Sequence, residues 1–263
     1  MKKKVILSLA VLILALSSFA ASAADSVRLV VGATPFPHAE ILRVVAPLLE
    51  AEGIQLEIRE FNDYVTPNIA LNDGSLSANY FQHVPYLENQ AREQNLDITW
   101  VVKVHIEPLG LYSKRVVTLD EITDGSSIAI PNDPTNCARA LRLLETAGLI
   151  TVAEGALVTA RDVTENPRNI RLHELEAAML PRTLDDMTAS VINTNFAVEA
   201  GLIPAHDAIT IESGESPYAN VVAVRTADVD LPEIQALARA MNSPEVRRFI
   251  EEELVPRGIV SAF

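Results

Sequence analysis

The chain has 263 residues, 49% of them apolar and 21% charged, a composition typical of one or two globular domains that excludes a largely disordered chain. Acidic residues outnumber basic ones by 35 to 21, and the resulting net charge of -14 argues against a nucleic-acid-binding protein, which would carry a basic surface. The single cysteine, Cys137, excludes an intramolecular disulfide framework and a cysteine-rich metal site.

Residues 1–23 have the pattern of an export signal. Three lysines at positions 2–4 precede an apolar run over 5–16, and Ala21-Ser22-Ala23 supplies the small residues of a cleavage site. We expect cleavage after Ala23, because the apolar run is shorter than the ~20 residues of a permanent membrane anchor, which is the alternative. No cysteine lies near the cleavage site, so we expect no N-terminal lipid anchor on the mature protein.

The mature sequence alternates strand and helix patterns. In its first half, strands are expected over 27–32, 54–61, 98–105 and 109–113, and helices over 38–51, 66–73 and 83–94. In its second half, strands are expected over 127–130, 170–175, 189–192, 207–211 and 220–225, and helices over 195–200, 232–241 and 245–254. Another helix is expected after the turn at 131–134, with Gly148 as its C-terminal cap. This alternation predicts α/β layers with largely parallel sheets in two units.

Aromatic residues are scarce but concentrated in one window. Five of the twelve in the mature chain lie between residues 61 and 86, and His83 lies among them. The five are Phe61, Tyr64, Tyr80, Phe81 and Tyr86. The pattern fits either a core cluster or an apolar slot with polar edges for the side chain of a small ligand.

Polar groups suited to a small anion occur at the ends of expected elements. The turn over 131–134 begins a helix that carries Arg139 one turn in, so its free N–H groups and the guanidinium could receive a carboxylate or phosphate. An ordinary capped helix with a solvated arginine is the alternative. Asn193 and Asn220 each follow a strand, where amide side chains usually satisfy turns.

Motifs of catalysis and cofactor binding are absent. The chain has no G-x-G-x-x-G after a strand, P-loop, H-E-x-x-H or G-x-S-x-G, and no carboxylate pair stands out as an acid and base. The histidines are scattered without i,i+4 pairs: His38, His83, His105, His173 and His206. We therefore expect neither an enzyme nor a cofactor, and a metal site is disfavoured, although ligands can converge from distant positions.

Six segments resemble the NlpA-type, MetQ-like methionine-binding proteins of bacterial ABC importers. They occur in the same order over about residues 27–255: Ala33-Thr34-Pro35-Phe36-Pro37-His38-Ala39-Glu40-Ile41-Leu42, Asp63-Tyr64-Val65-Thr66-Pro67-Asn68, Phe81-Gln82-His83-Val84-Pro85-Tyr86-Leu87, Pro131-Asn132-Asp133-Pro134-Thr135-Asn136, Leu184-Asp185-Asp186 and Glu215-Ser216-Pro217-Tyr218-Ala219-Asn220. One such segment would carry little weight, whereas six in register make the resemblance specific.

The resemblance implies a type II periplasmic-binding-protein fold, in which two α/β lobes enclose a ligand cleft. Lobe 1 would comprise 24–110 with 224–263, and lobe 2 would comprise 111–223. By the same resemblance Arg139 holds the ligand's carboxylate. The polar positions Asn136, Asn193 and Asn220 fix its backbone, and Tyr64, Phe81, His83 and Tyr86 form the side-chain pocket.

The expected function is capture of L-methionine or a related amino acid by hinge closure, and its delivery to the permease and ATPase of an ABC importer. Most members of the family carry a lipid-anchoring cysteine, whereas this signal ends Ala-Ser-Ala, so we expect a monomer free in the periplasm. Another amino acid, D-methionine or a methionine-containing dipeptide is the alternative ligand. A metal-binding receptor, in which His83 and other histidines would converge, and an enzyme acting on a small carboxylate are the less favoured alternatives.

Overall fold

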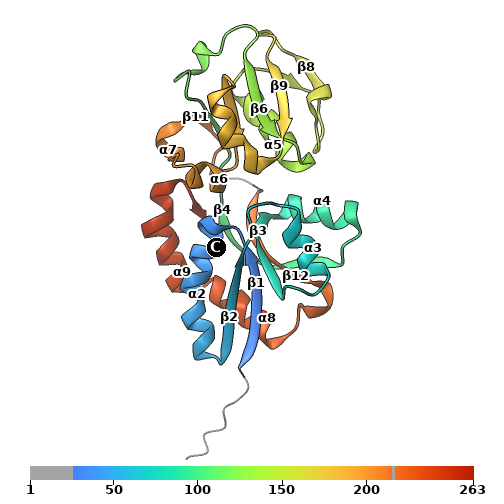
Figure 1. Cartoon of the computed structure of the whole chain (residues 1–263), viewed down its shortest axis with the longest axis vertical. Coiled ribbons are helices and arrows are strands. Elements are labelled where there is room, and N and C mark those ends of the chain that lie inside the picture. Colours follow the sequence, from blue (N-terminus) through green and yellow to red (C-terminus); the bar gives the residue numbers. More distant parts are fainter. Residues whose placement is uncertain (1–25, 215–216) are drawn as a thin grey trace, which may run out of the picture.

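Two lobes, each built on its own β-sheet, follow one another along the longest axis of the molecule (Figure 1). The structure is a computed structural model that describes residues 26–214 and 217–263. The expected export signal and its cleavage site lie outside the described residues, as do Glu215 and Ser216. The two-lobed α/β architecture expected from the sequence is confirmed.

The first lobe contains a six-stranded sheet in the order β13–β4–β12–β3–β1–β2. Its strands are β1 (Val27–Ala33), β2 (Ile54–Glu60), β3 (Ala78–His83), β4 (Ile98–Ile106), β12 (Ala219–Arg225) and β13 (Val260–Ser261). Strand β1 pairs in parallel with β2 and β3, whereas β12 pairs antiparallel with β3 and β4, and β13 antiparallel with β4.

Helices cover both faces of this sheet. The helices are α2 (Glu40–Ala51), α8 (Pro232–Met241) and α9 (Pro244–Phe249) on one side, and α3 (Thr66–Asn72) and α4 (Val84–Gln94) on the other. Strand β12 shows how both cores are filled. Val222 and Val224 belong to the core with α2 and α8, and Val221 and Ala223 to the core with α3 and α4, because successive side chains of a strand point to opposite faces.

The second lobe contains a five-stranded sheet in the order β11–β5–β10–β6–β9. Its strands are β5 (Gly110–Tyr112), β6 (Ser127–Pro131), β9 (Arg171–Leu175), β10 (Ala189–Ile192) and β11 (Ala208–Ile211), and a separate pair consists of β7 (Thr151–Val152) and β8 (Val163–Glu165). Helix α5 (Pro134–Thr146) buries Leu141 and Leu144 in the same core as Ile128 and Ile130 of β6. Gly148 follows α5 with a φ of +72°, as the predicted cap requires.

Short helical turns complete the fold and interrupt two of the expected helices. The turns are Pro35–Ala39, Leu119–Glu121, Ala160–Asp162, Ala177–Asp185, Thr226–Asp228, Ile250–Leu254 and Val255–Arg257, and the second lobe adds α6 (Thr194–Glu199) and α7 (Pro204–Asp207). The helix expected over 38–51 consists of a π-helical turn, Pro35–Ala39, followed by α2. The helix expected over 245–254 consists of α9 followed by a second π-helical turn, Ile250–Leu254.

The prediction of largely parallel sheets is wrong. Both sheets are mixed, because the strands that flank the two passages between lobes pair antiparallel with their neighbours. These strands are β4 and β5 at the first passage and β11 and β12 at the second. Strand β3 was not predicted, since its residues were interpreted as an aromatic cluster followed by a helix. All six of its residues are buried, so its sequence lacks the polar–apolar alternation that reveals a half-exposed strand.

The chain passes twice between the two sheets, and residues 215 and 216 of the second passage lie outside the described residues. The first crossover, residues 107–109, joins β4 to β5, and the second, residues 212–218, joins β11 to β12. Gly110 therefore lies in the second sheet, and residues 219–223 lie in the first, five residues before the return at 224 that the sequence analysis expected. An apolar strand carries no local signal for the sheet in which it pairs.

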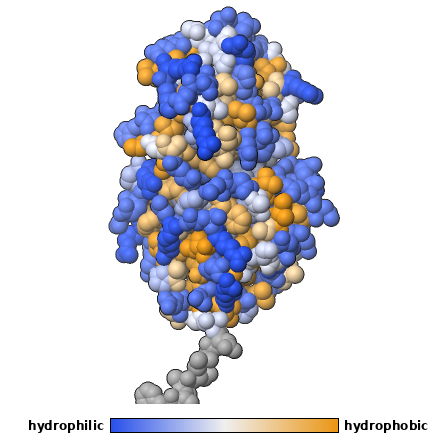
Figure 2. Space-filling view, viewed as in Figure 1, coloured by the Kyte–Doolittle hydropathy of each residue, from blue (hydrophilic) through white to orange (hydrophobic). Residues whose placement is uncertain are grey.

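The surface is dominated by hydrophilic residues, with apolar ones scattered over both lobes in the view of Figure 2. Among the described residues, no helix combines the length and the apolar character needed to cross a bilayer.

Gly110 leaves no room for a side chain where the first crossover enters β5. A Cβ atom built on it would lie 2.7–2.8 Å from ring atoms of Tyr112, whose side chain is fully buried. We expect Gly110→Ala to lower the free energy of unfolding by about 1–3 kcal/mol, as measured by urea denaturation. Gly214→Ala is the control, because its Cβ would meet Val260 at an ordinary 3.5 Å. Equal stability of the two variants would contradict this prediction.

Candidate functional site

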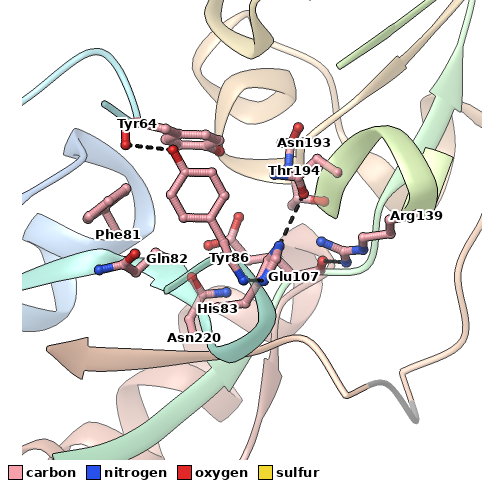
Figure 3. Close-up of a pocket in the computed structure, with 11 residues that line it drawn as sticks. Tyr64, Phe81, Gln82, His83, Tyr86, Glu107, Arg139, Asn193, Thr194 and Asn220 are labelled. Atoms are coloured by element: carbon pink, nitrogen blue, oxygen red, sulfur yellow. Dashed lines mark hydrogen bonds between the residues drawn. The ribbon is translucent and has the colours of Figure 1, made fainter. Parts of the chain in front are cut away.

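A cavity lies between the lobes, and side chains of both lobes line it. All eight residues predicted as a ligand site line it: Tyr64, Phe81, His83, Tyr86, Asn136, Arg139, Asn193 and Asn220. The sequence analysis missed three more lining residues, which are Gln82, Glu107 and Thr194. Figure 3 shows these side chains converging from both lobes.

The first lobe supplies an aromatic wall. The ring centroids of Tyr64, Phe81 and Tyr86 lie 5.8–6.0 Å apart, and the Tyr86 hydroxyl donates to the backbone carbonyl of Tyr64 at 2.8 Å. Phe196 of the second lobe packs against Tyr64 at 5.0 Å. Tyr80, in contrast, belongs to the core of the first lobe. The aromatic window thus contributes to both an apolar core and the cavity.

A chain of hydrogen bonds sets the amide orientations on the polar side of the cavity. Nδ1 of His83 accepts from the Tyr86 N–H, so its Nε2 carries the proton and donates to Oδ1 of Asn136 at 3.1 Å. Nδ2 of Asn136 donates to the Asp133 carboxylate, and Oδ1 of Asn136 also accepts from Nδ2 of Asn193 at 3.1 Å. Oδ1 of Asn193, on the other side of the same amide, is buried, and no described residue donates a hydrogen bond to it.

Arg139 extends from the second turn of α5 and is only 3% exposed. Its Nε donates to both carboxylate oxygens of Glu212 at 2.8 and 2.9 Å, and its Nη2 donates to Glu212 at 2.5 Å and to the Glu107 backbone carbonyl at 2.6 Å. The guanidinium also lies 4.3 Å from the ring centroid of Tyr218. Nη1 makes no hydrogen bond to any residue that the structure describes.

The start of α5 is not the anion receptor that the sequence analysis considered. The Asp133 carboxylate caps the helix by accepting the Asn136 N–H at 2.9 Å, and the Asp133 carbonyl accepts the Cys137 N–H. Since a carboxylate already occupies this end of the helix, the positive charge at the cavity comes from Arg139.

Glu107 is the carboxylate of the cavity, and two buried histidines hold it. Its Oε1 accepts from Nε2 of His105 at 2.8 Å and lies 3.3 Å from Nε2 of His38, while its Oε2 accepts from the Asn195 N–H at 3.0 Å. Nε2 of His38 also donates to Oδ1 of Asn220 at 3.1 Å. The position of Glu107 directly after a long strand was the one sequence signal that could have identified it.

The outer nitrogens of both imidazoles are also hydrogen-bonded. The Thr34 hydroxyl donates to Nδ1 of His38 at 2.7 Å, and the Tyr80 hydroxyl donates to Nδ1 of His105. Burial lowers the pKa of His38 to about 4 and that of His105 to about 3, and it raises the pKa of Glu107. The histidines are therefore neutral donors at neutral pH.

The donor atoms of His38, His105 and Glu107 lie within 4.8 Å of one another, the one metal-ligand-like group among the described residues. His83, which the metal-receptor alternative invoked, is not part of this group. Nε2 of His105 carries a proton that points at Glu107, and Nε2 of His38 carries one that points at Asn220, so a metal would have to displace both protons. Hydrogen bonding accounts for the geometry of the cluster.

The sequence model of the NlpA lipoprotein family matches residues 29–263. The chain belongs to this family. The D-methionine-binding lipoprotein MetQ of Escherichia coli is 43% identical to this NlpA-family protein over 212 residues, which cover 79% of this chain and 78% of that protein. The probable D-methionine-binding lipoprotein MetQ of Vibrio cholerae is 40% identical over 233 residues, 88% of this chain and 87% of that protein.

Solved structures of similar proteins extend the likeness to three dimensions. A nutrient-binding protein from Burkholderia cenocepacia, solved bound to methionine, has a TM-score of 0.86 and 44% identity, and the match covers 89% of this chain and 100% of that one. Lipoprotein Tp32 from Treponema pallidum has a TM-score of 0.87 at 38% identity, covering 90% of this chain and 100% of that one.

The buried histidines make the stability of this NlpA-family protein sensitive to acid. The pKa values of His38, His83 and His105 are lowered by burial from 6.5 to about 4, 3 and 3. Below about pH 6.5 the unfolded chain binds protons that the folded protein excludes, so the free energy of unfolding falls as the pH falls toward 4. Glu107, whose pKa is raised, offsets part of this loss.

We expect the melting temperature to decrease steadily between pH 7 and 4.5, corresponding to a loss of several kcal/mol at about 1.4 kcal/mol per unit of pKa shift. Differential scanning calorimetry would measure it. A His206→Gln variant should show the same pH dependence, because His206 is exposed. A melting temperature that is constant or rises on acidification would contradict the neutral state of the three histidines.

Proposed function

We propose that this NlpA-family protein is a receptor that binds methionine in the cavity between its lobes and delivers it to an ABC importer. The observation that carries the proposal is the juxtaposition, in one buried cavity, of an aromatic wall with a cationic and an anionic side chain. The relatives named for D-methionine binding, and the similar structure solved with methionine, support it.

The charged groups match the two charges of an amino acid. Nη1 of Arg139 is the nitrogen left to bind the ligand's carboxylate, since Glu212 and the Glu107 carbonyl occupy its other donors. Glu107 and the unpartnered Oδ1 of Asn193 are the acceptors for the ligand's ammonium group. In Asn220, whose Oδ1 already accepts from His38, the amide nitrogen is the group that can bind ligand.

The aromatic wall suits an apolar, polarisable side chain. Tyr64, Phe81 and Tyr86 would enclose the thioether, and each sulfur–aromatic contact is worth ~0.3–1.5 kcal/mol. His83 and Asn136, already joined by a hydrogen bond, would border the ligand where its side chain meets its backbone. None of these groups by itself distinguishes the L from the D configuration at the α-carbon, so D-methionine is tested together with L-methionine.

Ligand capture would use the two crossovers as a hinge. The lobes would be 26–106 with 219–263 and 110–211, and they meet directly at His83 with Asn136 and at Tyr64, whose hydroxyl donates to Asn195 at 2.6 Å. A ligand that contacts both lobes adds interactions only to the closed state and therefore shifts the equilibrium toward it.

Mass spectrometry of small molecules released by denaturation, followed by titration of refolded apoprotein, tests the proposal. Methionine at one hundred times its Kd adds ~2.7 kcal/mol of stability, which raises the melting temperature by about 5–10 °C for a chain of this length. The panel holds L-methionine, D-methionine, Gly-Met, other amino acids and zinc. No shift with any amino acid would overturn the proposal, and a shift with zinc alone would favour a metal receptor.

Arg139→Gln should weaken methionine binding by about 10- to 100-fold, because it removes a charged hydrogen-bond donor to the carboxylate. Arg142→Gln is the control for isothermal titration calorimetry. Arg142 lies one turn further along α5, bonds Glu145 and two loop carbonyls, and does not line the cavity. Equal affinities of the two variants would contradict the role proposed for Arg139.

We also propose that the mature protein is a monomer free in the periplasm, although its relatives are named lipoproteins. Lipid attachment at a processed N-terminus needs a cysteine, and Cys137 is the only one in the sequence. It is buried in α5, and burial raises the pKa of its thiol to about 12. This environment is unsuited to acylation.

Cells grown with radiolabelled palmitate should therefore yield unlabelled protein, and osmotic shock should release it with other periplasmic proteins. The Ala24→Cys variant is the comparison for labelling, because it places a cysteine directly after the expected cleavage site at Ala23. Label on the unsubstituted protein, or its retention in the membrane fraction, would contradict the proposal.

A further inference from the structure

Glu212 joins Arg139 to both crossovers. It lies at the start of the second crossover, and its carboxylate accepts three hydrogen bonds from Arg139. Glu212 is also fastened to the first crossover, because its backbone N–H donates to the Leu109 carbonyl at 2.9 Å and its Oε2 accepts the Leu109 N–H at 2.9 Å. Its side chain is 15% exposed, so these bonds are largely shielded from water.

The bonds to Glu212 use one edge of the guanidinium and set its direction. Nε and Nη2 both face the Glu212 carboxylate, and Nη2 also donates to the Glu107 carbonyl on the first crossover. The guanidinium also stacks on Tyr218, with its Cζ 4.3 Å from the ring centroid, and this contact further fixes its plane. A fork of two parallel N–H donors on one carboxylate is the most directional contact that an arginine makes. The free nitrogen, Nη1, therefore has a defined position.

Without Glu212, the guanidinium would have another carboxylate within the same cavity. Glu107 lines the cavity with Arg139, and the positive charge of Arg139 already acts on it by lowering its pKa against the effect of burial. An ion pair between the two would consume the cation needed for a ligand's carboxylate and the anion needed for its ammonium group. A cavity neutralised in this way would no longer favour a zwitterion.

We propose that Glu212 is a positioning residue that holds Arg139 away from Glu107, so that the cavity presents separate positive and negative groups to a zwitterionic amino acid. This inference rests on the proposed function and deepens it. Glu212 does not line the cavity, and it acts through Arg139 alone.

Two variants separate the geometry of Glu212 from its charge. Glu212→Gln keeps the length of the side chain and removes the charge, whereas Glu212→Asp keeps the charge and withdraws the carboxylate by one methylene. Both should weaken L-methionine binding by about 10- to 100-fold, the equivalent of one lost charged hydrogen bond. L-Methioninol, which keeps the ammonium group but has a hydroxymethyl group in place of the carboxylate, should lose less affinity than L-methionine in both variants, because only its contact with Glu107 is affected.

Glu145→Gln is the matched control for calorimetry with both ligands. Glu145 accepts from Arg142 at 2.8 Å on the same helix and, like Glu212, also accepts a backbone N–H, that of Val152 at 2.9 Å. It does not line the cavity, so its substitution should change neither affinity. Tighter methionine binding by Glu212→Gln would show that Glu212 competes with the ligand and would overturn the proposal. Equal weakening for both ligands, or no change, would do the same.

A readout without ligand keeps this test distinct from that of the proposed function. The ¹⁵N-resolved Nε–Hε signal of Arg139, identified by its loss in Arg139→Lys, should be protected from solvent exchange in the unsubstituted protein and exposed in both Glu212 variants. An unchanged signal overturns the positioning role even if methionine binds. If the unsubstituted protein does not bind methionine, the proposed function fails, and the role of Glu212 in presenting Arg139 to a zwitterion fails with it.

Discussion

An arginine that is 3% exposed must have its charge compensated before any ligand arrives, and the arrangement around Arg139 follows from this constraint. A buried guanidinium is stable where its charge is paired and most of its N–H donors are hydrogen-bonded in good geometry. Glu212 and the Glu107 carbonyl meet that requirement, and both belong to crossovers between the lobes. The charge proposed to recognise a ligand is thus attached to the segments about which the lobes would move.

The same constraint governs the acidic side of the cavity. Glu107 is almost fully buried, and His105 and the Asn195 N–H donate hydrogen bonds to it. His38 lies 3.3 Å from the carboxylate, and Thr34 and Tyr80 orient the two imidazoles. The neutral imidazoles lie beside the carboxylate without bringing a positive charge to it. Among the described residues that line the cavity, Asn193 alone has a buried side-chain atom, Oδ1, without a hydrogen-bond partner, and an unpaired buried acceptor is costly unless a ligand pairs with it.

Mixed sheets are a consequence of the two passages between lobes. Strands β4 and β12 pair side by side in the first sheet, and β5 and β11 pair side by side in the second, so both crossovers lie next to each other and to the cavity. Leu109 and Glu212 hydrogen-bond across them. Paired crossovers restrict the lobes to bending about one region, which is the geometry that a hinge requires.

The sequence by itself determined the alternating α/β pattern, the absence of catalytic motifs and, through the family resemblance, eight of the eleven residues that line the cavity, because periodicity and short motifs are local properties. Tertiary structure alone decided the rest. Strand β3 is buried throughout and has no alternation, and residues 219–223 carry no mark of the sheet that they join. Glu107 and Glu212 looked like two among 35 acidic residues, since the partners that give each its role lie up to 103 residues away in the chain.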